Sequence, residues 1–344
     1  MLEGRMTPPL VETIGLARHY HIGRRVLRAL DGVDITIGRG ETLGLVGESG
    51  SGKSTLGRTL VGLQVPSLGT VRFDGQDTAT IHGEALRMLR RRRQLVFQDP
   101  SGALNPRMTI GATLTEHLRV QGWNRRTAQA RVPEVLEQAG LPSAYAARYP
   151  HEISGGQRQR AVIARAISTD PDFIVADEPV SALDVSTRAQ IINLLRGLQR
   201  ARSLTMLFIS HDLSVVAHTC RHVAVMYLGR IVEVAPRAAL FASPLHPYTS
   251  ALLSAVPLPD PVRERARSRV ILPGETPDPS APPSGCHFHP RCPRATEICA
   301  RVDPVMRRFG PDHQAACHHA GELPNIEAAV AIARAESEPR SGHL

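Results

Sequence analysis

Continuous apolar runs, separated by stretches of helical periodicity, dominate the middle of this 344-residue chain. A strand that is apolar on both faces must be covered on both faces, so the runs predict a mostly parallel, covered sheet. Five of them have the length and composition of strands: 42–47, 93–98, 172–178, 204–211 and 223–234. A 3.6-residue apolar stripe in "TRAQIINLLRGLQRARS" predicts a helix that packs against the sheet through Ile191, Leu194, Leu195 and Leu198.

The two ends of the chain have different patterns. Residues 16–41 predict short antiparallel strands with turns, which makes the fold an α/β core with a small β addition. After about residue 235 the sequence is rich in proline and poor in periodicity, so we expect a boundary and an extended appendage rather than a second large core. The regions we expect are a main domain at 10–235 with a helical subdomain at about 100–165, an extension at 236–320, and a terminal helix and tail at 321–344.

Composition narrows the class of protein only moderately. Hydrophobic content of 42% and charged content of 21% are typical of a soluble globular chain. No apolar run approaches the roughly 20 residues that span a bilayer, and the first ten residues lack the apolar core of a signal peptide, so we expect a cytoplasmic protein.

The net positive charge of the chain is compatible with several kinds of binding partner. The net charge of +9 is compatible with nucleic acid, an anionic membrane surface or a bound nucleotide, and an aromatic content of 4% disfavours single-stranded nucleic acid. The sharpest basic feature is Arg90 to Arg93, which we interpret as a solvated helix face, with a membrane or partner contact as the alternative.

The stretch "GESGSGKST" contains Lys53, the only lysine of the chain, and lies between an apolar strand and a helix. This setting is typical of a phosphate-binding loop, in which Gly47, Gly50 and Gly52 let successive N–H groups point inward at the helix N-terminus. Lys53 would contact the β- and γ-phosphates, and the Ser54 hydroxyl would bind Mg²⁺. The alternative is a plain glycine turn before a helix.

Candidate groups for hydrolysis follow three other apolar runs. Asp177 and Glu178 end the run "FIVADE", where Asp177 would hold Mg²⁺ through water and Glu178 would act as general base, unless they only cap a strand end. His211 could contact the γ-phosphate, or be an ordinary surface histidine. Gln98 could order the attacking water and Mg²⁺, or be an ordinary loop residue.

A second glycine-rich loop, "ISGGQRQR", precedes a helix. Its hydroxyl and glycines predict another anion site, formed by Ser154, Gly155, Gly156 and Gln157. One nucleotide needs only one such cradle, so this loop is expected to serve the nucleotide of another subunit. The prediction is a head-to-tail dimer with ATP between the two loops.

With these motifs the chain resembles the ATP-binding subunit of an ABC transporter, in the oligopeptide/dipeptide importer branch, over roughly residues 10–320. The branch is indicated by "VFQDPSGALNPRMTI", "RYPHEISGGQRQR", "HPYTSALLSAVP" and "GCHFHPRCP". In this family the second glycine-rich loop, Ser154 to Gln157, would be the signature loop. One departure is Ile153, where leucine commonly begins that loop, and an apolar exchange of equal size should be tolerated.

The resemblance implies a role for each motif. Gly47 to Thr55 would be the Walker A loop, Gln98 the Q-loop, Ser181 to Asp184 the D-loop and His211 the switch histidine. Tyr20 would stack on adenine, with a packing tyrosine as the alternative. The implied contacts to ATP are Gly47, Ser49, Gly50, Gly52, Lys53, Ser54, Thr55, Gln98 and Asp177, with Ser154, Gly155, Gly156, Gln157 and Asp184 contributed by a partner subunit; the implied Mg²⁺ ligands are Ser54, Gln98 and Asp177.

The resemblance also implies partners and a location. These are two membrane permease subunits, a second homologous ATPase in a heterodimer and an extracytoplasmic solute-binding protein, with this chain on the cytoplasmic side of the membrane and no nucleic acid bound. ATP-driven closure of the dimer would power peptide uptake. The alternatives are an importer of nickel or another small solute, and a soluble ABC ATPase that acts on DNA or ribosomes, for which the positive charge would supply phosphate contacts.

Four cysteines, Cys286, Cys292, Cys299 and Cys317, cluster near the end of the chain. In a reducing cytoplasm such a cluster indicates metal before disulfide, although the spacing fits neither short zinc knuckles nor ferredoxins, and leaves the metal open. The resemblance implies a [4Fe–4S] cluster, with Zn²⁺ and then free thiols as alternatives. The neighbouring histidines are alternate ligands that we interpret as surface residues: His287, His289, His318 and His319.

Overall fold

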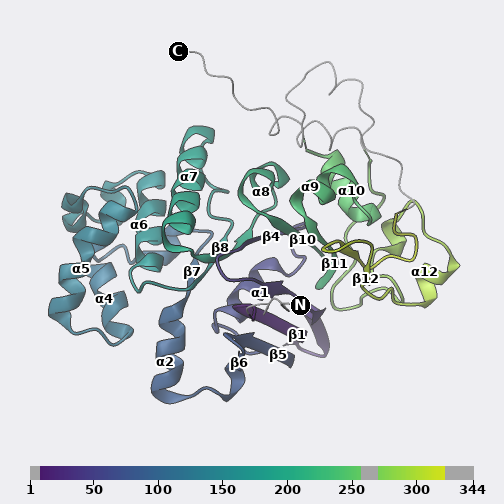
Figure 1. Ribbon diagram of the computed structural model, residues 1–344, viewed down its shortest axis with the longest axis horizontal. Helices are drawn as coiled ribbons and strands as arrows, with labels where there is room; N and C mark the ends of the chain where they lie inside the picture. The colour runs from purple at the N-terminus through teal and green to yellow at the C-terminus, as the bar shows by residue number, and fades with distance from the viewer. Residues whose placement is uncertain (1–7, 257–269, 322–344) are drawn as a thin grey trace, which may run out of the picture. The chain divides into compact units, whose positions relative to one another are not determined.

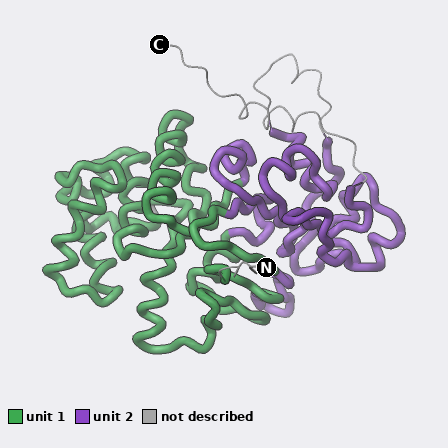
Figure 2. The backbone as a smooth tube through the Cα atoms, viewed as in Figure 1, with its two compact units in different colours: residues 1–16, 34–42, 54–210 green, residues 17–33, 43–53, 211–344 purple. Residues whose placement is uncertain are grey.

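The computed structural model describes residues 8–256 and 270–321 and divides the chain into two compact units (Figure 2). Unit 1 consists of Met1–Leu16, Asp34–Thr42 and Ser54–Ser210, and unit 2 of Ala17–Val33, Leu43–Lys53 and His211–Leu344. The chain therefore crosses between the units repeatedly, and none of these crossings lies at the boundary expected near residue 235. The helix and tail predicted for 321–344 lie outside the described residues, apart from Gly321.

Three parallel strands form the core of unit 1 (Figure 1). They are β7 (Arg93–Val96), β8 (Phe173–Asp177) and β9 (Thr205–Ile209), and β8 pairs with both of the others. Every residue of the three strands is buried. The prediction of parallel, fully covered strands is confirmed for these segments.

Helices pack around these strands, and α4, α5 and α6 lie together at one end of unit 1 (Figure 1). The predicted helix over 187–203 is α7, which buries Ile191, Leu195 and Leu198 and leaves Leu194 half-buried. Helix α1 lies very close to β8 and β9, because a Cβ on Gly57 would come within 2.8 Å of Val175. The helix bounds are α1 (Lys53–Leu60), α2 (Gly83–Arg92), α3 (Pro100–Ala103), α4 (Ile110–Val120), α5 (Arg125–Gln138), α6 (Gly155–Ile167) and α7 (Val185–Arg202).

A smaller sheet is built from β2, β1, β5 and β6 in that order, with β3 also paired to β1. The β1–β3 pair is antiparallel, as predicted for the first section of the chain. The β5–β6 pair, which lies outside that section, is also antiparallel. The sequence patterns did not identify β5 or β6, since their half-exposed residues form no apolar run. The strand bounds are β1 (Val11–Ile22), β2 (Arg25–Val33), β3 (Thr36–Ile37), β5 (Leu68–Phe73) and β6 (Gln76–Asp77).

The arginine cluster is not a uniform solvated face. Arg90 is exposed on α2, but Arg93 begins β7, is only 3% exposed and donates from Nη1 to the carbonyl oxygen of Leu60 at 3.0 Å. Burial lowers the pKa of Arg93 to about 10. Arg92 pairs with Asp74 and Asp172. The interpretation as a solvated face is therefore wrong for Arg93, which lies at the change from helix to buried strand.

In unit 2, strands pair in the order β12, β13, β11, β10 and β4. The segment 223–234, predicted as one strand, forms two antiparallel strands instead. Leu228 and Gly229 both have positive φ, +44° and +79°, and form the turn that an unbroken apolar pattern conceals. β4 and β10 are parallel. The bounds are β4 (Thr42–Val46), β10 (His222–Tyr227), β11 (Arg230–Pro236), β12 (Arg307–Arg308) and β13 (Gln314–Ala315).

The proline-rich region after residue 235 is more ordered than predicted. α9 buries Leu240 and Phe241, and α10 begins with Pro247 at its first position and buries Tyr248 completely. The prediction of an extended appendage is wrong for these helices, since helices of six to eight residues are too short to give a clear periodicity. The helical bounds in this unit are α8 (Leu213–Thr219), α9 (Arg237–Ala242), α10 (Pro247–Ser254), the 3₁₀ turn η4 (His289–Arg291) and α12 (Glu297–Arg301).

A buried carboxylate connects α10 to the strands of unit 2. Glu233, fully buried on β11, accepts hydrogen bonds from the backbone N–H groups of Leu245 and His246 at 2.8 and 2.9 Å. His246 is 1% exposed, and its Nδ1 accepts from the backbone N–H of Tyr248 at 3.1 Å. Burial lowers the pKa of His246 to about 4. The neutral imidazole is therefore the form that caps α10.

This histidine predicts a pH-dependent stability. In the unfolded chain His246 is protonated below its pKa of 6.5, whereas in the folded chain it is protonated only below about pH 4. Between these two values protonation favours the unfolded state, so stability is lost as the pH falls. We expect the free energy of unfolding to drop by about 2 kcal/mol between pH 7 and pH 5 from this group alone. His246→Asn, which keeps a capping acceptor, should flatten the slope in urea titrations. The exposed His82→Asn serves as control, and an equal slope in both variants would contradict the assignment.

Candidate functional site

The predicted phosphate loop follows β4 and leads into α1. Lys53 is 5% exposed, and its ammonium donates to the carbonyl oxygens of Gly47 and Glu48, each at 2.8 Å, and to Ser51 Oγ at 3.4 Å. The lysine charge is thus held within the loop, at the N-terminal end of a helix. Ser49 and Gly50 are exposed at the tip. A lysine, loop N–H groups and a helix N-terminus together form the arrangement that binds phosphate.

Two of the loop glycines are required by close backbone approach. A Cβ on Gly47 would lie 2.2 Å from the carbonyl oxygen of Met226, and one on Gly52 would lie 2.3 Å from that of Ala29. The N–H of Gly229 also donates to the carbonyl oxygen of Ser51 at 2.9 Å. Backbone contacts from the strands of unit 2 therefore fix the path of the loop.

Unit 1 contains the acidic part of the predicted site. Asp177 ends β8, is 2% exposed and accepts a hydrogen bond from the hydroxyl of Ser54 at 2.9 Å. Two of the three expected Mg²⁺ ligands are therefore in contact, although 123 residues separate them. Thr55 follows in the first turn of α1 and is half-buried. A serine hydroxyl beside a carboxylate is the donor set that holds Mg²⁺ at a nucleotide site of this type.

The adjacent acid has a different environment. Glu178 adopts a left-handed conformation with φ of +45°, and its N–H donates to the carbonyl oxygen of Ile209 at 3.0 Å. Its carboxylate accepts from Nε2 of the exposed Gln98 at 3.1 Å. Left-handed backbone at a non-glycine residue is costly and is often found at functional sites. The structure thus brings Gln98 and Glu178 together.

The second glycine-rich loop is the N-terminus of α6. Ser154 and Gln157 form a reciprocal capping box, in which Ser154 Oγ accepts from the Gln157 N–H at 3.3 Å and Gln157 Oε1 accepts from the Ser154 N–H at 2.9 Å. A Cβ on Gly156 would lie 2.4 Å from Thr187, in the first turn of α7. The loop is therefore in close contact with the start of that helix, and Gly155 opens α6 beside it.

Asp184 caps α7 and contacts the same threonine. Its carboxylate accepts from the N–H and the hydroxyl of Thr187, both at 2.9 Å, and from Ser186 Oγ at 2.6 Å. These hydrogen bonds, that of Ser186 first, hold the pKa of Asp184 well below its usual value. The residues expected to serve a partner's nucleotide, Ser154 to Gln157 and Asp184, are thus grouped within unit 1.

The two remaining predicted contacts lie in unit 2. Tyr20 is half-buried on β1, and the guanidinium of Arg18 lies 4.7 Å from its ring centroid. His211 is exposed and directly precedes Asp212, which caps α8. Their contacts to a nucleotide therefore stay predictions.

Sequence patterns missed a set of residues that hold Glu48, the second residue of the phosphate loop. Its backbone N–H donates to the hydroxyl of Tyr248 at 2.8 Å, and its carboxylate accepts from Arg291 and Thr276. Local periodicity contains no information on contacts between residues that are 200 or more positions apart. The run around Arg291 was identified as a branch motif and a possible metal site, and neither interpretation assigned a role to Arg291.

The four clustered cysteines line one small cavity with Phe288. Cys299 and Cys317 are buried, Cys286 and Cys292 are half-buried, and none of them forms a disulfide. Burial raises the pKa of Cys286 and that of Cys317 to about 11. Within the described residues, however, no group of three or more Cys, His, Asp or Glu side chains is placed to hold a metal ion.

The neighbouring histidines differ from one another. His289, His318 and His319 also line the cysteine cavity and are half-buried. His287 is 9% exposed and does not line it, so its interpretation as a surface residue is wrong. Burial lowers the pKa of His287. The residue therefore belongs to the packed interior of unit 2.

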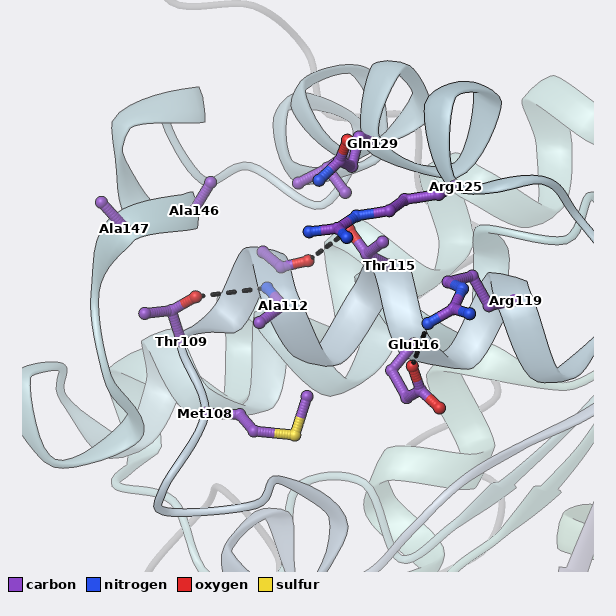
Figure 3. A pocket seen from close by; sticks show the side chains of 12 residues that line it. Met108, Thr109, Ala112, Thr115, Glu116, Arg119, Arg125, Gln129, Ala146 and Ala147 are labelled. Carbon is purple, nitrogen blue, oxygen red and sulfur yellow. Dashed lines mark hydrogen bonds and ion pairs between the residues drawn. The ribbon is translucent and has the colours of Figure 1, made fainter.

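A separate groove of about 660 Å³ lies in the helical part of unit 1, between α4, α5 and the 3₁₀ turn η2 (Ser143–Ala147) (Figure 3). Arg125 reaches from α5 towards Thr115 on α4, and Arg119 pairs with Glu116 at 3.4 Å. Ala112 and Met108 also line the groove. None of the predicted ATP contacts is among the residues that line it, so this groove is distinct from the nucleotide site.

Comparison with known proteins identifies the family. A family model described as "ABC transporter" matches residues 30–181, and one described as "Oligopeptide/dipeptide transporter, C-terminal region" matches residues 232–299. A putative peptide import ATP-binding protein of Brucella ovis is 53% identical over 310 residues, which cover 90% of this chain and 97% of that protein. The chain belongs to the ABC transporter family and is an ABC ATPase. Its C-terminal region assigns it to the oligopeptide/dipeptide branch, which confirms the resemblance.

A second relative and a solved structure support the same family assignment. The putative oligopeptide transport ATP-binding protein YkfD of Bacillus subtilis is 48% identical over 313 residues, 90% of this chain and 95% of that protein. A dimeric, post-hydrolysis structure of the ATP-binding cassette MJ0796 bound to ADP and Pi has a TM-score of 0.60 and 29% identity, covering 66% of this chain and 98% of that one. The predicted α/β cassette fold is therefore confirmed. Among the described residues, no helix is both long and apolar enough to cross a membrane.

The close approach at Gly47 gives a direct test of the loop. Gly47→Ala would force its methyl group against the Met226 carbonyl oxygen, so the loop must shift and ATP binding should weaken at least about tenfold. Gly197→Ala is the matched control, because nothing lies within 4 Å of a Cβ at this helical position. Fluorescent-nucleotide titration measures both. Equal affinities in the two variants would show that the loop tolerates the shift.

Proposed function

We propose that this chain is the ATP-hydrolysing subunit of a membrane importer for peptides. The observation that carries the proposal is the coincidence of the Ser54–Asp177 and Gln98–Glu178 contacts with a C-terminal region of the oligopeptide/dipeptide type. Curated relatives with about half of their residues identical are described as putative peptide import or oligopeptide transport ATP-binding proteins. We propose 10–235 as the nucleotide-binding domain, with the helical subdomain at about 100–165, and 236–320 as the transporter-type extension.

ATP binding is proposed to use the phosphate loop and Mg²⁺. Lys53 would bind the β- and γ-phosphates, and Ser54 with Asp177 would hold the metal ion, assisted by Gln98. The contact between Ser54 and Asp177 supports this assignment, because both oxygens lie where one ion can bind them. Tyr20 would stack on adenine. The other loop contacts are those to Gly47, Ser49, Gly50, Gly52 and Thr55.

Hydrolysis is proposed to depend on Glu178. Its carboxylate would accept the proton of the attacking water, Gln98 would orient that water, and His211 would contact the γ-phosphate. The hydrogen bond between Gln98 and Glu178 supports a shared water-ordering role. The buried Asp177 and the more accessible Glu178 then divide metal binding and base catalysis between two adjacent acids.

Dimer closure is proposed to couple hydrolysis to transport. Ser154, Gly155, Gly156, Gln157 and Asp184 would contact the nucleotide held by a second ATPase, in a head-to-tail arrangement. Their grouping at the N-termini of α6 and α7 supports an anion site, since both helix ends direct positive dipoles to this side. ATP then acts as a ligand that favours the closed dimer.

The proposed assembly contains two membrane permeases, a second and related ATPase, and an extracytoplasmic solute-binding protein that supplies specificity. This chain would lie on the cytoplasmic side of the membrane and bind it through the permeases. The test is purification from native membranes in mild detergent, with identification of the co-purifying proteins. We expect permeases and a solute-binding protein. Ribosomal or DNA-processing proteins without permeases would contradict the proposal.

Glu178→Gln should bind ATP with nearly unchanged affinity and hydrolyse it at least about a hundredfold more slowly, because the amide cannot accept the proton. Phosphate release at saturating ATP and direct nucleotide titration measure the two properties separately. Glu137→Gln, an exposed acid on α5, is the control that should hydrolyse normally. Normal turnover in Glu178→Gln would assign the general base elsewhere.

For the four cysteines we propose a thiolate metal site, as a [4Fe–4S] cluster or as Zn²⁺. Their shared cavity supports the proposal, but the side chains must move from the arrangement that the structure shows, and the thiols must lose protons, for metal to bind. Anaerobically purified protein should contain iron and sulfide in equal amounts, and Cys292→Ser should lose both. Cys220→Ser, at a buried cysteine that does not line this cavity, should keep them. Zinc without sulfide would select the alternative, and a metal-free protein would refute the site.

A further inference from the structure

Glu48 brings a carboxylate into the phosphate-binding loop, next to a site proposed for a polyanion. Its oxygens accept hydrogen bonds from Arg291 Nη1 at 2.8 Å, Arg291 Nη2 at 3.2 Å and Thr276 Oγ1 at 2.8 Å. The guanidinium therefore binds the carboxylate in a fork, with the threonine as a third donor. The side chain of Arg291 is only 9% exposed and that of Glu48 29% exposed.

The backbone of Glu48 is held as firmly as its side chain. Its N–H donates to the hydroxyl of the fully buried Tyr248 at 2.8 Å, and its carbonyl oxygen accepts from the ammonium of Lys53 at 2.8 Å. One residue thus connects the phosphate-binding lysine to two parts of the C-terminal region. All these residues belong to unit 2.

The residues that hold Glu48 are themselves fixed by packing. The rings of Tyr248, Tyr227 and Phe288 contact one another at centroid distances of 4.7 to 5.5 Å. Arg291 ends the 3₁₀ turn η4, which begins directly after Phe288, and its Nε lies 3.4 Å from the carbonyl oxygen of Pro273. The fork is therefore presented by a rigid surface rather than by a free side chain.

The charge balance explains why such a fork matters for ATP. An unpaired carboxylate on the phosphate loop would repel the phosphates of ATP, and solvent and salt would screen this repulsion only weakly. When Arg291 pairs with the carboxylate, most of the repulsion between the carboxylate and the phosphates is removed. The two hydrogen bonds of the fork also fix the position of the loop backbone at Glu48. Burial alone would lower the pKa of Arg291, but its hydrogen bonds to Glu48 hold the pKa above the usual value. The guanidinium is thus charged at every physiological pH.

We propose that Arg291 is a positioning residue of the ATP site, through which the C-terminal region of the chain sets the affinity of the phosphate loop for ATP. The inference rests on the proposed function, since it assigns a role towards the same nucleotide. Arg291 lies within residues 232–299, which match the oligopeptide/dipeptide C-terminal model. The proposal therefore gives this region a role in ATP binding by the cassette. Arg291 touches no phosphate in this account and acts only through Glu48.

The test is a double-mutant cycle on the full-length chain. Arg291→Met leaves the Glu48 carboxylate unpaired, so the Kd for ATP should rise roughly tenfold, while turnover at saturating ATP stays within about twofold. Glu48→Gln removes the charge in an isosteric side chain and should change the Kd by less than about threefold. In the double variant the Kd should return to within about threefold of Glu48→Gln, because no charge remains to be neutralised.

Controls separate positioning from general stability. Arg301→Met removes an exposed ion pair with Glu297 from the same C-terminal region and should leave the Kd unchanged. If Arg291→Met does not fold, Arg291→Lys, which keeps the charge without the fork, should fold and show an intermediate Kd. Thermal unfolding of each variant identifies the folded ones.

Each outcome decides the proposal. A rise in Kd for Arg291→Met that Glu48→Gln cancels supports it. Effects of the two substitutions that simply multiply, or an unchanged Kd in Arg291→Met and Arg291→Lys, overturn it and leave the proposed function intact. A wild-type chain that does not bind ATP, and so does not differ from Lys53→Ala, would instead overturn the proposed function together with this inference.

Discussion

The binding of Lys53 inside its own loop is the interaction on which the rest of the site depends. An ammonium can remain at a 5% exposed position only if acceptors surround it, and here the carbonyl oxygens of Gly47 and Glu48 supply them. Those carbonyls are available because the loop passes so close to the Met226 and Ala29 carbonyl oxygens that only glycine fits at Gly47 and Gly52. The burial of the Lys53 charge, the path of the loop and its close packing against the strands therefore depend on one another. A change in any of them alters the other two.

The two acids of unit 1 show how a strand end separates two chemical roles. Asp177 remains within the strand, buried against Ser54, while Glu178 turns away in a left-handed conformation towards Gln98. Adjacent carboxylates would repel each other if both faced the same way. The backbone turn at Glu178 directs them to different partners, which makes a division into metal ligand and general base physically possible.

Long apolar runs and glycine motifs were sufficient to predict β7, β8 and β9, the phosphate loop and the helix start at Ser154, since each depends on a local pattern. Local patterns failed where a short feature interrupts or follows a run. Leu228 and Gly229 turn a single apolar segment into two strands, and α10 is too short to display a period. They also failed for Glu48, whose partners Tyr248 and Arg291 lie 200 and 243 residues away. Only the folded chain brings those residues together.

The central claim, that this ATPase powers the uptake of peptides, is tested most directly in cells that lack the gene. Uptake of labelled peptides of several lengths should be restored by the wild-type chain and by no variant that fails to hydrolyse ATP, whereas uptake of nickel should be the same with or without the gene. Peptide uptake that is independent of the chain, or nickel uptake that requires it, would contradict the account.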